Sequence, residues 1–134
     1  MPLESRRLMP DGCEYVVNFI RRHRNVNSVE MFESSYYKAI LSIERKGGYP
    51  SIKAYIADVY ILTFDDVVEV LETYPDIDCI VVISNWNHYT DKAKREAHRQ
   101  GVGVFTLDEF TEALKYRERG FLGTGCAKKT EDAI

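Results

Sequence analysis

The sequence predicts an α/β fold in three layers, with helices on both faces of a central mixed sheet. Cys79–Ile83 is a continuous run of apolar, mostly β-branched residues, which is typical of a strand covered on both faces. A polar helix between Thr90 and Gly101 follows, and Val102–Phe105 is a second short apolar run. Strand, helix and strand in this spacing indicate a βαβ unit, so that a pair of parallel strands lies at the centre of the fold.

The chain before this unit supplies a helix and a first strand. Residues 1–12 contain prolines at both ends and are interpreted as an N-terminal arm. Glu14–His23 places its apolar residues on one side and is predicted to be an amphipathic helix. Val26–Phe32 is predicted to be a short strand.

Two alternating runs then predict a β-hairpin. Tyr36–Arg45 alternates apolar and polar residues, and Ser51–Leu62 does the same. The segment Lys46–Pro50 between them, K-G-G-Y-P, is a strong turn signal. The hairpin therefore joins the parallel pair in one mixed sheet of about four or five strands.

The remaining helices have recognisable starts. Thr63 with Asp66 forms a capping box for a helix that ends before Pro75. Thr106 with Glu109 forms a second capping box, and this last helix is expected to run to about Arg117. The helix between them has few apolar residues and is expected to sit lightly on the sheet.

Length and composition are those of one globular domain. We expect a single domain over residues 1–134, with a core over 13–117 and a flexible tail over 118–134. No apolar run approaches the ~20 residues of a membrane span, so no membrane partner and a cytoplasmic location are expected. The net charge of −3 argues against holding nucleic acid by bulk electrostatics alone.

The three cysteines are far apart along the chain, at Cys13, Cys79 and Cys126. Their spacing indicates neither a zinc site nor a disulfide framework. Cys79 is interpreted as a small core residue.

The order of elements and the last third of the chain resemble the restriction-endonuclease-like superfamily, the PD-(D/E)XK nucleases. The branch related to methyl-directed restriction enzymes has a V-V-I-S strand, an aromatic-Thr step, an A-x-x-x-A helix and a Gly-Val strand. Here these features lie at Val81–Ser84, Tyr89-Thr90, Ala93 with Ala97, and Gly101-Val102. The resemblance covers roughly residues 14–117 and implies an αβββαβ core followed by a further βα unit.

The chemistry of that superfamily uses acidic residues on the hairpin and an Asp/Glu-x-Lys motif on its second strand. The carboxylates hold Mg²⁺, which activates water, and the lysine orients the nucleophile. Here the motif falls at Ser51-Ile52-Lys53, so the lysine is present and the acid is absent. Glu33 and Glu44 are the candidates for the missing carboxylates, and they would be the Mg²⁺ ligands of an active site.

Other interpretations of these residues stay open. Glu44 and Lys53 on neighbouring strands also suit a surface ion pair. Asp58 is a further acidic candidate, but in a regular strand it points to the face opposite Lys53. The resemblance therefore implies a nucleic-acid-associated protein that is catalytically reduced, or a metal-dependent nuclease if a relocated carboxylate works with Lys53.

Two basic groups are candidates for phosphate contacts. One ends the first predicted helix and the other lies on the helix Asp91–Gln100. Their members are Arg21, Arg22 and Arg24, and Lys92, Arg95 and Arg99. Together they suit one basic face for nucleic acid; cations at a helix C-terminus and a solvated charged helix are the alternative readings.

The loop Ser84–Tyr89 follows the carboxyl end of the central strand, where ligands bind in open α/β sheets. Trp86 and His88 in this loop offer stacking faces for a base or an anchor for a protein partner. A Trp that covers the helix ends is the alternative. A small-ligand sensor of Rossmann-like kind at the strand ends is a third, weaker reading.

Tyrosine is frequent in and beside the hairpin. The residues are Tyr36, Tyr37, Tyr49, Tyr55 and Tyr60. Such rings suit a surface that is buried in an assembly, and they predict a homodimer through the hairpin or the edge strand. The alternative function is thus a non-enzymatic interaction or assembly module that uses the aromatic hairpin and the Trp86 loop.

Overall fold

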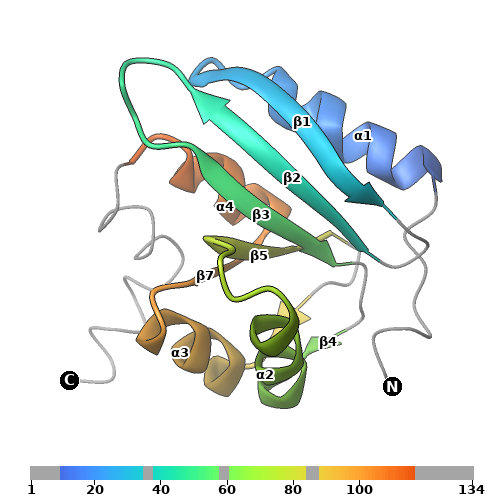
Figure 1. Ribbon diagram of the computed structural model, residues 1–134, viewed down its shortest axis with the longest axis vertical. Helices are drawn as coiled ribbons and strands as arrows, with labels where there is room; N and C mark the ends of the chain where they lie inside the picture. Colours follow the sequence, from blue (N-terminus) through green and yellow to red (C-terminus); the bar gives the residue numbers. More distant parts are fainter. Residues whose placement is uncertain (1–9, 35–37, 58–60, 84–87, 117–134) are drawn as a thin grey trace.

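The computed structural model describes residues 10–34, 38–57, 61–83 and 88–116. In these ranges four helices accompany a five-stranded mixed sheet with the strand order β1-β2-β3-β5-β7 (Figure 1). Two short strands, β4 and β6, form a second sheet. The predicted α/β class and the predicted order of the longer elements are confirmed.

The elements have the following bounds. The helices are α1 (Pro10–Arg21), α2 (Phe64–Thr73), α3 (Asp91–Arg99) and α4 (Leu107–Ala113). The strands of the main sheet are β1 (Val26–Ser34), β2 (Lys38–Arg45), β3 (Ile52–Ala57), β5 (Cys79–Val82) and β7 (Gly103–Thr106). The second sheet consists of β4 (Ile61–Leu62) and β6 (His88–Tyr89).

The sheet is antiparallel on one side and parallel on the other. β1 pairs with β2 and β2 with β3 in antiparallel fashion, while β5 lies between β3 and β7 and is parallel to both. The hairpin turn uses Gly47 and Gly48 at φ 71° and 76°, a conformation that side chains other than glycine rarely adopt. The predicted hairpin and the predicted parallel unit are both confirmed.

Two hydrophobic cores lie on opposite faces of the sheet, and strand alternation assigns residues to them. Ile52, Ala54 and Ile56 of β3 belong to the core shared with α1 and α4. Tyr55 and Ala57 belong to the core shared with α2 and α3. The alternation predicted for the hairpin is therefore correct within the described residues.

Both predicted capping boxes are present. Thr63 and Asp66 exchange bonds at 2.9 and 3.3 Å, and Thr106 and Glu109 do so at 3.1 and 3.3 Å. These bonds satisfy the first backbone N–H groups of α2 and α4, which have no partner inside the helix.

Several boundaries differ from the prediction, and three of them differ by more than two residues. α1 begins at Pro10 rather than Glu14, because proline at a first helical position loses no hydrogen bond. The second hairpin strand ends at Ala57, and Ile61–Leu62 pairs with β6 in the second sheet. α4 ends at Ala113 instead of running to about Arg117. The 118–134 tail and most of the 1–12 arm lie outside the described residues.

Among the helices of the described ranges, none is long and apolar enough to cross a membrane.

Candidate functional site

The second sheet sets where α2 and α3 begin. Leu62 in β4 is paired with Tyr89 in β6, and the Thr90 N–H donates to the Leu62 carbonyl at 3.0 Å. Thr63 and Thr90 then cap α2 and α3. Because the strands are in register and each is followed directly by a cap, the two helices start side by side on one face of the main sheet (Figure 1).

An open pocket lies between the start of α2 and the outer side of α3. Its volume is about 220 Å³, and it is lined by Phe64, Lys92, Arg95, Glu96 and Arg99. The Phe64 residue is 42% exposed. Pockets that enclose a drug-sized ligand have volumes of roughly 300–1,000 Å³, so this one has room for a single base or phosphate group.

The pocket has an uneven distribution of charge. Arg99 and Gln100 bind the two carboxylate oxygens of Glu96 at 2.5 and 2.6 Å, and these bonds lower the Glu96 pKa, so that it is ionised at neutral pH. Arg99 is therefore engaged in an ion pair within the helix. Lys92 and Arg95 are exposed and make no ion pair with any described residue.

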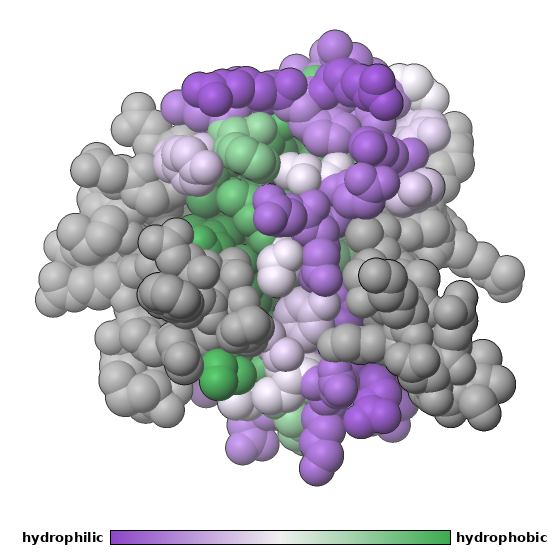
Figure 2. All heavy atoms as spheres, turned by 180° about the vertical axis from the view of Figure 1, so that it is seen from behind, coloured by the Kyte–Doolittle hydropathy of each residue, from purple (hydrophilic) through white to green (hydrophobic). Residues whose placement is uncertain are grey.

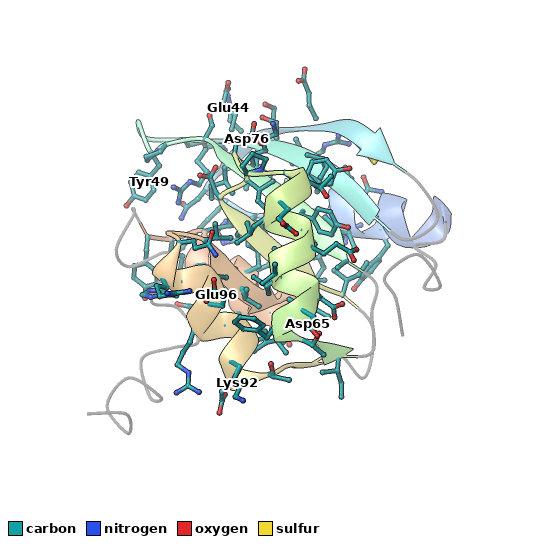
Figure 3. The ribbon with its side chains drawn as sticks, turned by 60° about the horizontal axis from the view of Figure 1, so that its bottom comes forward. Glu44, Tyr49, Asp65, Asp76, Lys92 and Glu96 are labelled. Carbon is teal, nitrogen blue, oxygen red and sulfur yellow. The ribbon has the colours of Figure 1, made fainter. Side chains whose placement is uncertain are left out.

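Helical spacing places these cations on one side of α3. Lys92, Arg95 and Arg99 are three and four residues apart, which puts them in one row along the helix. Figure 3 shows Lys92 near the start of α3, with Glu96 farther along the same helix and Asp65 near the start of α2. The pocket thus offers two uncommitted cations beside an exposed aromatic ring.

Lys94 lies on the opposite side of α3, facing the sheet. It is 2% exposed, and its Nζ donates to the Val104 carbonyl and lies 4.7 and 4.8 Å from the rings of Tyr89 and Phe105. Its Nζ is also 4.0 Å from Glu109, which accepts bonds from the Tyr89 hydroxyl at 2.8 and 2.9 Å. Ala93 and Ala97 are the buried apolar residues of α3, and Lys94 adds a polar contact to the sheet that was not predicted.

Lys53 and Glu44, two of the predicted catalytic residues, do not bind each other. The Lys53 Nζ is 2.6 Å from Asp76, and this bond lowers the Asp76 pKa. Glu44 accepts a bond from Asn27 at 2.7 Å. The predicted surface pair of Glu44 with Lys53 is therefore wrong: the loop before β5 brings Asp76 closer, and Asp78 binds the Lys53 N–H at 2.7 Å.

Other predicted residues fall outside the described part of the chain. Asp58 and Trp86 belong to ranges that the structure leaves undescribed, and so do the side chains of Glu33 and His88. Glu33 is placed through its backbone alone, opposite Ile40 in β2. Among the described residues, no three His, Cys, Asp or Glu side chains come together as metal ligands would.

The two predicted basic groups lie in different layers. Arg21, Arg22 and Arg24 lie at or just after the end of α1, whereas Lys92 and Arg95 lie on α3, across the sheet. The Arg21 guanidinium also donates to the Val29 carbonyl at 3.2 Å. The prediction that both groups form one continuous basic face is therefore wrong, because the sheet lies between them.

The described tyrosines of the hairpin are used inside the molecule. Tyr55 is 2% exposed and its ring lies 5.6 Å from that of Tyr74. Tyr49 packs under the Arg45 guanidinium at 5.2 Å. The edge strand β1 has register shifts near Val26 and Met31, and such irregularities disturb the row of hydrogen-bonding groups that a partner strand would need. A homodimer through this edge stays a prediction.

The described part of the back of the molecule is mostly hydrophilic. Figure 2 shows purple surface over the top and down the middle of this face, with green confined to smaller areas. The described residues in this view form no broad apolar surface. The pocket between α2 and α3, which combines an exposed aromatic residue with exposed cations, is the candidate functional site.

Cys79 is buried, as the sequence predicts, and burial raises the pKa of its thiol well above the usual value. It is a core residue with no reactive character.

No family model, no curated protein and no solved structure matches this chain.

Sequence reasoning missed two members of the site. Phe64 and Glu96 fall within predicted helices, and no role at a site is predicted for either. An aromatic residue directly after the Thr63 cap was a usable signal for Phe64, because the first turn of a helix is often open to solvent. Nothing along the chain places it beside Lys92, since that contact depends on the pairing of β4 with β6.

Proposed function

We propose that this protein is a nucleic-acid-associated domain that contacts phosphates through the exposed side of α3. The observation that carries the proposal is the pocket in which Lys92 and Arg95 lie beside the exposed ring of Phe64. Lysine and arginine supply most protein contacts to phosphate, and an aromatic ring next to them offers a stacking face for a base. With a net charge of −3 on the whole chain, binding relies on this local patch.

We also infer a restriction-endonuclease-like arrangement whose catalytic site is reduced. The antiparallel strands β1 to β3, followed by α2 and the parallel strand β5, support this inference because they follow the order of that superfamily's core. Lys53 is bound to Asp76 and Glu44 to Asn27, which supports the loss of a shared Mg²⁺ site.

The experiment is a binding titration of labelled oligonucleotides, followed by fluorescence anisotropy at low salt. The test variant carries Lys92→Glu and Arg95→Glu together. We expect its affinity to fall at least about ten-fold, because two attractive phosphate contacts become repulsive. Circular dichroism should show an unchanged fold, since both side chains are exposed.

The matched control is the double variant Arg22→Glu and Arg24→Glu. It changes the net charge by the same amount, but on the other side of the sheet. We expect its affinity to stay within about two-fold of the unchanged protein, apart from the general effect of net charge. If the control loses binding and the α3 variant retains it, the contact surface is the end of α1 and the proposal is wrong.

A further inference from the structure

The pocket has features that distinguish between single-stranded and double-stranded nucleic acid. In a duplex, the faces of the bases are stacked on each other, and a protein reaches phosphates and base edges. In a single strand, the faces of the bases are free to stack on an aromatic side chain. An exposed ring at a phosphate-binding surface is therefore most directly accessible to a base that is unpaired.

Phe64 is such a ring. It is the first residue of α2, and 42% of it is exposed although Val67, one turn later, is fully buried. A large apolar side chain gains stability from burial, and Phe64 gives up part of that gain at this position. Its ring lines the same pocket as Lys92 and Arg95.

The cations lie at a distance that suits a short stretch of backbone. Arg99 binds the Glu96 carboxylate, so the cations that make no ion pair with a described residue are Lys92 and Arg95, toward the end of α3 nearest α2. These two residues are three apart on α3, which corresponds to about 4.5 Å along the helix axis.

The size of the pocket also suits a single unpaired base. A pocket of about 220 Å³ is below the range that encloses a complete nucleotide cofactor, but a single splayed base resting on an open ring does not have to be enclosed.

From these observations we infer that the α2–α3 pocket binds single-stranded nucleic acid, with an unpaired base stacked on Phe64 and the adjoining phosphates on Lys92 and Arg95. The inference rests on the proposed function, because it uses the same cations. It adds the substrate class and a specificity-determining residue.

The test compares Phe64→Leu with Phe64→Tyr on one labelled oligonucleotide, used alone and as a duplex with its complement. Leucine keeps an apolar side chain without a stacking face, and tyrosine keeps the ring. We expect Phe64→Leu to weaken single-strand binding at least about five-fold and Phe64→Tyr to stay within about two-fold of the unchanged protein. The unchanged protein should bind the duplex more weakly than the single strand, and neither substitution should change its affinity for the duplex by more than about two-fold.

The outcomes separate the two levels of the proposal. If Phe64→Leu leaves single-strand binding unchanged, or weakens both forms equally, while Lys92→Glu with Arg95→Glu abolishes binding, the single-strand inference is wrong and the phosphate surface remains. If the charge reversal leaves binding of both forms unchanged, the proposed function fails together with the inference. Thermal unfolding of each variant, expected to match the unchanged protein, excludes loss of folding as the cause.

Discussion

His23 links the end of α1 to the end of α4, and its hydrogen bonds define its protonation state. Its Nδ1 accepts from the Asn25 N–H at 3.1 Å, so the proton lies on Nε2, which donates to the Thr111 carbonyl at 2.9 Å. Burial lowers the pKa of His23, the bond to Thr111 raises it, and the charges of Lys115 and Arg24 lower it further. The neutral form of the His23 ring is therefore the one that can make both hydrogen bonds.

Stability is therefore expected to depend on pH through His23. The folded-state pKa lies below the ordinary value of 6.5, so the unfolded chain binds a proton first as the pH falls. The contribution of neutral His23 to the stability of the fold is present above pH 6.5, and it is lost as the pH falls through the folded-state pKa. Chemical denaturation between pH 7.5 and about 5.5 should show this loss in the unchanged protein and a flatter profile in His23→Gln. His98→Gln, at an exposed position, should keep the original profile; equal profiles for all three proteins would contradict this account.

Lys94 is a charged residue whose side chain is buried between α3 and the sheet. Its aliphatic stem lies in the core between α3 and the sheet, while its ammonium group binds the Val104 carbonyl and faces two aromatic rings. This combination accounts for a lysine that is 2% exposed on a helix whose other basic residues are solvated.

Replacing Lys94 by methionine tests that role. We expect the free energy of unfolding to fall by about 2 kcal/mol, because the hydrogen bond from a charged donor is lost and the Val104 carbonyl stays unsatisfied. Lys92→Met on the same helix is the matched control and should change stability by less than about 0.5 kcal/mol. Urea denaturation measures both, and a Lys94→Met protein as stable as its control would be contrary to the account.

At the scale of elements, the sequence was most informative where local chemistry decides the structure. Capping residues Thr63, Thr90 and Thr106 mark the three helix starts correctly, because each hydroxyl accepts a hydrogen bond from the N–H three residues ahead. Strand ends were less predictable. Residues up to Leu62 alternate well enough to extend β3, but pairing with β6 places Ile61 and Leu62 in another sheet, and pairing is not visible in one segment alone.

Removal of one cap should have a measurable cost. In Thr106→Ala, the Glu109 N–H loses its acceptor and the capping box of α4 is broken. We expect the free energy of unfolding to fall by about 1 kcal/mol. Thr73→Ala, at the exposed end of α2, removes a hydroxyl without removing a cap and should cost less than about 0.5 kcal/mol. Thermal unfolding of the two variants gives the comparison, and an equal cost for both would show that the cap has no special role.

At the scale of the whole molecule, the sheet determines which residues act together. Sequence patterns predicted the two faces of the hairpin strands and the parallel pairing of β5 with β7, since hydrophobic alternation and the βαβ spacing are local signals. They did not separate Arg22 and Arg24 from Lys92, nor bring Asp76 to Lys53, because both results depend on how distant segments are arranged around the sheet. The cations of the candidate site were therefore predicted from the sequence, whereas the position of Phe64 beside them follows from the fold.

The proposed reduction of the catalytic site has a direct consequence for activity. With Lys53 bound to Asp76 and Glu44 bound to Asn27, we expect no metal-dependent cleavage of plasmid, single-stranded DNA or RNA with Mg²⁺ or Mn²⁺ beyond that seen with EDTA. Lys53→Ala and Glu44→Ala proteins, assayed at the same high concentration, should be indistinguishable from the unchanged protein. Cleavage that requires the metal and is lost in either variant would instead identify an active nuclease.

The central claim is that α3 binds phosphates, and the salt dependence of binding tests it most directly. Each phosphate contact to a single strand contributes about −0.7 to the slope of log K against log salt concentration. Replacing both uncommitted cations in one protein, Lys92→Gln with Arg95→Gln, should make the slope shallower by about 1.4, the sum for two lost contacts. The same slope in this protein and the unchanged one would mean that these side chains do not touch phosphate, and the account would be wrong.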